Sequence, residues 1–170
     1  SEGIRYYSNV MATFTPSLRK AIEKAKTLEI NIIAPGHGPV YRKNPQKIID
    51  DYFRFSRYAE GAGKNEITIL WGSMYGMTAK AIDYVEDILQ RENVKYNKLQ
   101  MPLESESEMV ATIFRSAGII IAAPTYEYKL FPPVAAALNE LGRKRITGKA
   151  AFRFGSYGWS GGAEKELNEI

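Results

Sequence analysis

A buried strand that runs into a loop of small and hydroxylated residues constrains this chain more than any other feature. Residues 67–71 form a short apolar run with β-branched side chains, which indicates a buried strand. Residues 72–78 form the loop, and apolar residues then recur at helical spacing. The first turn of a helix has unpaired N–H groups and the positive end of the dipole, and both favour a phosphate. The sequence therefore predicts an α/β unit with a phosphate site after its first strand.

The loop at 72–78 does not match the common nucleotide-binding patterns. Gly72 and Gly76 have the wrong spacing for the G-x-G-x-x-G fingerprint of dinucleotide binding. The pair Gly63-Lys64 precedes the strand, so it does not form a Walker loop. Residues 73–78 have the order S-x-x-G-x-T, which is similar to the loop that holds the FMN phosphate in flavodoxins. We therefore expect a single phosphate held by neutral donors.

Strand and helix patterns alternate after residue 65, which favours a doubly wound parallel sheet in an α/β fold. The expected strands are residues 67–71, 94–101, 118–123 and 149–155. Helices are expected after residue 78, after a capping box at 105–108, from Pro132 and from near Ala163. Four strands alone leave one edge of the sheet uncovered.

Ligands bind at the carboxyl ends of the strands in such a sheet. The loops at 124–133 and 156–162 are therefore expected beside the loop at 72–78. All three are rich in hydroxyls, glycines and aromatic rings, as a flat ring with a phosphate tail requires. The expected cofactor-binding residues are Ser73, Met74, Tyr75, Gly76, Met77, Thr78, Pro124, Thr125, Tyr126, Glu127, Tyr128, Ser156, Tyr157, Gly158, Trp159, Ser160 and Gly161.

Residues 1–60 are expected to form a helix, a short strand, a rigid loop and a second helix. Thr15-Pro16 marks the first helix start, and that helix is expected to run to about Leu28. Residues 30–34 indicate a strand, and Asn44-Pro45 starts the second helix.

The loop between them, Pro-Gly-His-Gly-Pro at 35–39, contains His37, the only histidine in the chain. A lone histidine is more often structural or exposed than functional. A histidine between two glycines after a strand is nevertheless placed like a metal ligand. No cluster of histidine and acidic ligands accompanies His37, so the other ligands of such a metal must lie elsewhere.

Composition excludes several classes of protein. A chain of 170 residues with 45% hydrophobic residues suits one domain with or without part of another. The net charge of +4 is too scattered to indicate nucleic-acid binding, and the basic run at 143–145 is expected to be a solvated helix end. No apolar run approaches the ~20 residues of a membrane span, and the first residues lack a secretory pattern. The absence of cysteine excludes disulfides and fits a reducing cytoplasm, so we expect a cytoplasmic protein.

Six motifs in order along the chain resemble those of flavodiiron proteins, also called A-type flavoproteins. They lie at residues 5–9, 35–39, 72–76, 124–126, 130–133 and 155–162. The resemblance implies that residues 1–60 are the C-terminal part of a metallo-β-lactamase-like diiron domain. It also implies a linker at 61–65 and a truncated flavodoxin-like FMN-binding domain at 66–170. The family's upstream iron ligands and its fifth flavodoxin strand are not in this sequence.

The same resemblance implies an oxidoreductase that reduces dioxygen to water, nitric oxide to nitrous oxide, or both, at a non-haem diiron site. FMN would relay electrons from rubredoxin or a similar donor, and two chains would pair head to tail. His37 would be the single iron ligand in this sequence, so this chain alone is expected to be inactive. Trp159 and Tyr126 are expected to border the flavin ring, although Trp159 could instead fill the interface between domains.

Two alternatives share the fold. A flavodoxin-type electron carrier would not need residues 1–60, and an FMN-dependent quinone reductase has no use for the loop at 35–39. A receiver-type regulator is excluded, because it needs an acidic pocket after the first strand, where this chain has Trp71-Gly72-Ser73.

Overall fold

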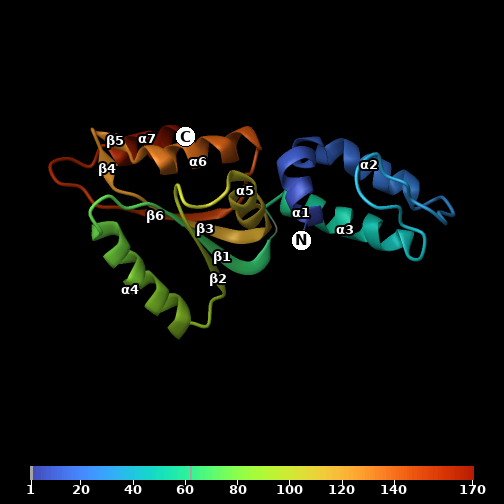
Figure 1. The fold of residues 1–170 in the computed structure, drawn as a ribbon, viewed down its shortest axis with the longest axis horizontal. Helices are drawn as coiled ribbons and strands as arrows, with labels where there is room; N and C mark the ends of the chain where they lie inside the picture. Colours follow the sequence, from blue (N-terminus) through green and yellow to red (C-terminus); the bar gives the residue numbers. More distant parts are fainter. Residues whose placement is uncertain (1, 62) are drawn as a thin grey trace.

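The computed structural model of the chain describes residues 2–61 and 63–170. It has two parts placed end to end along the longest axis (Figure 1). Residues 2–60 form a bundle of helices, which we call the helical unit. Residues 63–170 form the α/β unit, which contains the sheet. Among the described residues, no helix combines the length and the apolar character that crossing a membrane requires.

A four-stranded parallel sheet is the framework of the α/β unit. The strands lie in the order β2-β1-β3-β6. Their bounds are β1 (Lys64–Trp71), β2 (Tyr96–Gln100), β3 (Ser116–Ala122) and β6 (Ala150–Phe154). This arrangement confirms the predicted doubly wound α/β fold. It also leaves β6 at an edge of the sheet, as expected from four strands.

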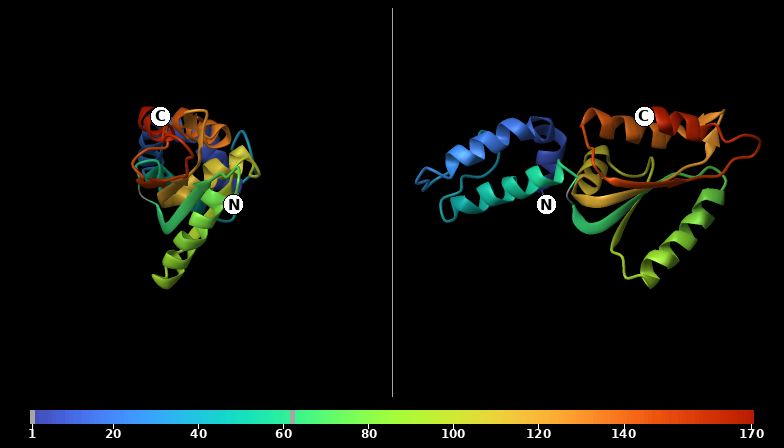
Figure 2. Two further views of the ribbon diagram at one scale, coloured as in Figure 1. Left: turned by 90° about the vertical axis from the view of Figure 1, so that its left-hand side faces the viewer. Right: turned by 180° about the vertical axis from the view of Figure 1, so that it is seen from behind.

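Helices cover both faces of the sheet (Figures 1 and 2). They are α4 (Met77–Arg91), α5 (Glu106–Arg115), α6 (Pro132–Arg143) and α7 (Ala163–Glu169). Ile69 of β1 packs toward α4, whereas its neighbour Leu70 packs in the core of α5, α6 and α7. Successive side chains of a strand point to opposite faces. Because helices cover both faces, both residues are fully buried. The predicted cap of α5 is confirmed: the Ser105 hydroxyl accepts from the Glu108 N–H at 3.4 Å.

The helical unit consists of short turns followed by two packed helices. Its elements are α1 (Glu2–Tyr6), a π-helical turn η1 (Tyr7–Met11), a 3₁₀ turn η2 (Ala12–Phe14), α2 (Thr15–Ala25) and α3 (Pro45–Tyr58). The predicted start of α3 is confirmed, because the Asn44 side chain accepts from the Lys47 N–H at 3.2 Å.

Three local predictions for the helical unit are wrong in detail. Residues 30–34 do not form a strand, and only an isolated bridge joins Ile33 to Tyr41. A strand needs neighbouring strands, and the described residues of this unit supply none. Helix α2 ends at Ala25 instead of Leu28, and Thr15 does not cap it. The Thr15 hydroxyl instead donates back to the Ala12 carbonyl at 2.7 Å.

The expected linker at 61–65 is tightly packed where it is described. A side chain at Gly61 would collide with the backbone of Gly148, and one at Gly63 with the backbone of Ser116. Strand β1 already begins at Lys64, and Ala62 lies outside the described residues. The division of the chain at 61–65 stays a prediction.

Lys149 joins the two units without an acidic partner among the described residues. Its Nζ donates to the carbonyl oxygens of Tyr58, at 3.3 Å, and Phe114, at 2.8 Å. Tyr58 ends α3 and Phe114 lies in the last turn of α5, so the ammonium sits at two helix C-termini, where carbonyls lack helical partners. Burial lowers the pKa of Lys149 from 10.5 to about 8.

We predict that the chain becomes more stable as pH rises from about 8 toward 10.5. In this window the folded chain has released the Lys149 proton, whereas the unfolded chain still binds it. Raising the pH disfavours the state that holds more protons, so the free energy of unfolding rises. Urea denaturation across this range should show the rise in the original chain and not in Lys149→Met. The variant Lys95→Met, which removes an exposed lysine, should keep it.

Candidate functional site

Three loops at the carboxyl edge of the sheet enclose a cavity of about 650 Å³. The loops follow β1, β3 and β6, and they lie at the end of the molecule that faces away from the helical unit (Figure 1). The lining residues are Ser73, Met74, Tyr75, Met77, Pro124, Thr125, Tyr126, Glu127, Tyr128, Ser156, Tyr157, Gly158, Trp159 and Ser160. Each is among the residues that the sequence predicted to bind the cofactor. The predicted residues Gly76, Thr78 and Gly161 do not line the cavity.

The first loop turns sharply into α4 at Gly76. This residue has φ +80°, in the left-handed region that favours glycine, and it is the residue before the helix begins. Its N–H donates to the Ser73 hydroxyl at 3.1 Å, which holds Ser73 over the start of the helix. The first turn of α4 therefore adjoins a hydroxyl-bearing loop, the arrangement that suits a phosphate.

Thr78 links the first and last loops. It is 1% exposed, and its hydroxyl lies 3.0 Å from that of Ser156, so the two share a hydrogen bond. The sequence predicted Thr78 as a direct phosphate donor. The structure places it behind Ser156, which itself lines the cavity. Its contact with a phosphate stays a prediction.

A small hairpin forms the middle wall of the cavity. It consists of β4 (Thr125–Tyr126) and β5 (Lys129–Leu130), joined by a two-residue turn. Both turn residues have positive φ, +46° at Glu127 and +64° at Tyr128, as a type I′ turn requires. Such turns favour Asn-Gly, and Glu127-Tyr128 lacks that pattern, so no local signal predicted this turn. Backbone strain of this kind is often found at ligand sites.

Contacts with α7 hold the strained hairpin in place. The Leu130 N–H donates to the Glu166 carboxylate at 2.6 Å, and the backbone of Tyr128 lies directly against Gly162. A Cβ atom at Gly162 would collide with that backbone. The glycine therefore lets the last loop approach the hairpin closely.

Several aromatic side chains border the cavity without packing into the core. Trp159 is 99% exposed and Tyr75 is 90% exposed. The alternative that Trp159 fills a domain interface within this chain is therefore wrong. An open cavity with aromatic walls and hydroxyl groups is of a size that suits a flat ring with a polar tail. The residues present thus fit FMN, and their contacts with it stay predictions.

His37 lies apart from this cavity, in the helical unit. It is exposed, and its ring centroid is 6.2 Å from that of Tyr6. It also lines a second, mainly apolar cavity of about 270 Å³ between α2 and α3. In the described part of the chain, no three histidine, cysteine or acidic residues cluster so that they could hold a metal. These residues by themselves do not make a diiron site.

The turn at Glu127 and Tyr128 generates a stability prediction. The substitution Tyr128→Gly should raise the free energy of unfolding by up to about 1 kcal/mol, because glycine tolerates positive φ. Tyr157→Gly is the control: Tyr157 is also an exposed tyrosine beside the cavity, but its φ is not positive. Urea denaturation should show a higher free energy of unfolding for Tyr128→Gly and not for Tyr157→Gly. Equal changes in the two variants would contradict the prediction that the positive φ of Tyr128 is strained.

Comparison with known sequences finds relatives along the whole chain, although no protein-family model matches it. A nitric oxide reductase of Moorella thermoacetica is 30% identical over 170 residues, which cover 99% of this chain and 42% of the relative. An anaerobic nitric oxide reductase flavorubredoxin of Vibrio vulnificus is 32% identical over 169 residues, which cover 97% of this chain and 34% of the relative. The chain thus spans 34% to 42% of the length of these curated relatives.

Solved structures agree with the sequence relatives. The rubredoxin oxygen:oxidoreductase of Desulfovibrio gigas matches with a TM-score of 0.87 at 26% identity. The flavodiiron protein of Giardia intestinalis matches with a TM-score of 0.86 at 30% identity. Each match covers 98% of this chain, both units included, and 42% of the solved chain. On its sequence relatives and its fold together, the chain belongs to the flavodiiron protein family.

Proposed function

We propose that this chain is the FMN-binding, electron-relay part of a flavodiiron oxidoreductase. That enzyme would reduce dioxygen to water, nitric oxide to nitrous oxide, or both, at a non-haem diiron site. The observation that carries the proposal is the cavity at the carboxyl edge of the sheet. Residues from three loops, far apart in the sequence, converge there, and all of them except Met77, Glu127 and Tyr128 come from the motifs that resemble those of the family.

The residues around the cavity divide into two roles. Ser73, Thr78 and Ser156 would hold the phosphate with neutral hydroxyl groups beside the start of α4. Tyr126 and Trp159 would border the flavin ring. FMN supplies the ability to take up and pass on electrons one or two at a time. The role of this chain is to bind and orient that group at an open edge, where a donor can approach.

Residues 1–60 would complete the C-terminal part of a metallo-β-lactamase-like diiron domain. His37 would provide one iron ligand, and the remaining ligands would come from residues outside this sequence. This assignment disfavours the flavodoxin-type carrier and the FMN-dependent quinone reductase, neither of which needs a packed helical unit with such a loop. The relatives match both units, which also supports the flavodiiron assignment.

The position of the cavity supports transfer of electrons between chains. It lies beyond the carboxyl end of β1, whereas the helical unit lies beyond the amino end (Figure 1). A strand of eight residues spans about 26 Å, so roughly the length of the sheet separates the cavity from His37. A head-to-tail homodimer would bring the cavity of one chain close to the iron site of the other. The electron donor would be rubredoxin or a rubredoxin-like protein, as the names of two matched proteins suggest.

We predict that the chain binds FMN more tightly than riboflavin, because only FMN carries the phosphate. Thr78→Val should weaken FMN binding by about 1 kcal/mol, the usual size of one hydrogen bond. Thr68→Val is the matched control, since Thr68 forms the same kind of hydroxyl pair with Ser116, at 2.7 Å, away from the cavity. Isothermal titration calorimetry should find FMN affinity unchanged in the control. Equal affinities for FMN and riboflavin would contradict the prediction that this loop binds the phosphate.

We also predict that this chain, expressed alone, binds flavin without stoichiometric iron and does not turn over. A diiron site needs several histidine and carboxylate ligands, and the described residues contain no group of three or more that could hold a metal. The measurements are iron and FMN per chain, followed by consumption of dioxygen and of nitric oxide with reduced rubredoxin. Stoichiometric iron with turnover would show that His37 has partners within this sequence.

A further inference from the structure

The two units meet in an aromatic cluster between α5 and the helices that precede the sheet. Its buried members are Ile4, Tyr7, Phe55, Tyr58 and Phe114. The rings of Tyr7 and Phe114 are almost fully buried, with their centroids 5.7 Å apart. Apolar burial of this kind holds surfaces together but has little directional preference. The cluster alone therefore does not fix the angle between the units.

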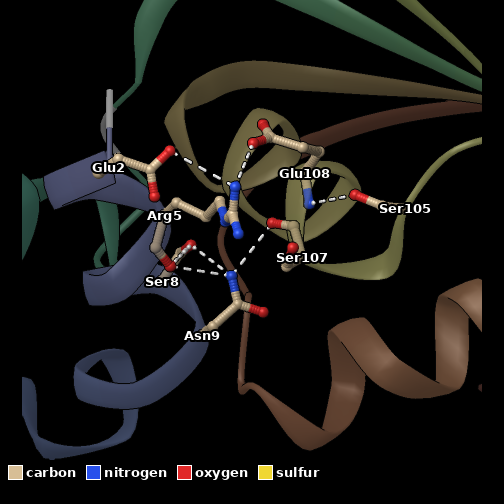
Figure 3. Close-up of polar contacts among 7 residues, drawn as sticks. All are labelled: Glu2, Arg5, Ser8, Asn9, Ser105, Ser107 and Glu108. Atoms are coloured by element: carbon tan, nitrogen blue, oxygen red, sulfur yellow. Dashed lines mark hydrogen bonds and ion pairs between the residues drawn. The ribbon is translucent and has the colours of Figure 1, made fainter.

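Asn9 makes the directional contacts at the margin of this cluster (Figure 3). Its Nδ2 donates to the Ser107 carbonyl in the first turn of α5, at 3.1 Å, and to the Arg5 carbonyl, at 2.9 Å. The backbone carbonyl of Asn9 accepts from the Nζ of Lys144, which lies just after α6, at 3.0 Å. A single residue of the helical unit thus bonds two separate elements of the α/β unit.

The local backbone explains why the Asn9 side chain reaches α5. Asn9 lies in the π-helical turn η1, where the chain leaves the α-helical pattern. The Arg5 carbonyl accepts from the side chains of Ser8, at 3.2 Å, and Asn9, at 2.9 Å. These bonds orient the Asn9 amide toward Ser107. Arg5 itself pairs with Glu108 of α5 at 3.2 Å, but both side chains are exposed, so that ion pair contributes little.

Further contacts lie away from Asn9. Lys149 donates to the carbonyls at the ends of α3 and α5. The backbones of Gly61 and Gly148, both with positive φ, approach so closely that a side chain on Gly61 would not fit. The basic run at 143–145 was expected to be a solvated helix end, yet its Lys144 binds Asn9 and Glu140. These hydrogen bonds lie at separate points of the junction, so together they oppose rotation of one unit relative to the other about the aromatic cluster.

We propose that Asn9 is the positioning residue of a clasp that holds the helical unit and the α/β unit in one fixed orientation. The clasp consists of Arg5, Asn9, Ser107, Lys144 and Lys149. It keeps the loop that bears His37 at a constant distance and angle from the cavity at the far end of the sheet. This inference goes beyond the proposed function, because it requires neither flavin nor iron to be bound.

The test measures the distance between the two units in the full chain of 170 residues. The chain has no cysteine, so Lys24→Cys on α2 and Asp87→Cys on α4, both exposed, accept one spin label each. Double electron–electron resonance then gives the distribution of the distance between the labels. The clasp predicts a narrow distribution in the original chain and a broader one in Asn9→Ala. Asn9→Asp, which replaces the donor with a carboxylate facing two carbonyls, should broaden it as well.

Asn139→Ala is the matched control. Its Nδ2 also donates to a helix carbonyl, that of Ala135 at 3.0 Å, but within α6 and away from the junction. The distribution should stay narrow in this variant, and thermal unfolding recorded for each variant separates loss of stability from loss of orientation. A narrow distribution in folded Asn9→Ala overturns the proposal. If Asn9→Ala does not fold, Lys144→Met, which removes the cation from the Asn9 carbonyl, is judged by the same two outcomes.

Discussion

The register of the parallel strands is the constraint on which the rest of the structure depends. Trp71 of β1 pairs with Ala122 of β3, and Ala122 pairs with Phe154 of β6, so the three strands end at the same level. The loops that follow them must therefore leave the sheet side by side. A slip of one residue would exchange Ile69 and Leu70 between the two faces, and each would then have to fit the close packing of the other core. The cavity thus exists because burial on two faces fixes the register.

The same direction of the strands separates the two ends of the molecule. The four strands are parallel, and β1, β3 and β6 lead into the loops of the cavity, so the sheet lies between the helical unit, which contains His37, and the proposed flavin site. This polarity supports the proposal that electrons would pass between chains instead of within one chain. In the proposed homodimer, the second chain would have to align with both the helical unit and the cavity. A constant orientation between the two units would allow this alignment. Burial of the aromatic cluster holds the two units together, and the directional hydrogen bond from Asn9 to Ser107 restricts the angle between them.

The predictions that the structure confirms depend on residues that are close together in the sequence. Strand β1, the cap at Ser105 and the cap at Asn44 each depend on residues within a few positions of one another, and the structure confirms them. The lining of the cavity also follows from sequence, because parallel topology sends the three loops to one edge. The strand expected at 30–34 failed for the opposite reason. Its apolar run is typical of a strand, but strands require neighbours, and the described chain offers it only a bridge to Tyr41.

The sequence by itself determined the fold class, the alternating strands and helices of the α/β unit and the three ligand-edge loops. Only the tertiary structure decided which side chains meet. The Thr78–Ser156 pair, the environment of Lys149 and the bond from Asn9 to Ser107 join residues far apart in the chain. The left-handed turn at Glu127 is likewise imposed by the pairing of β4 with β5. Local patterns encode local geometry, whereas these contacts depend on how the packed elements bring distant backbone segments together.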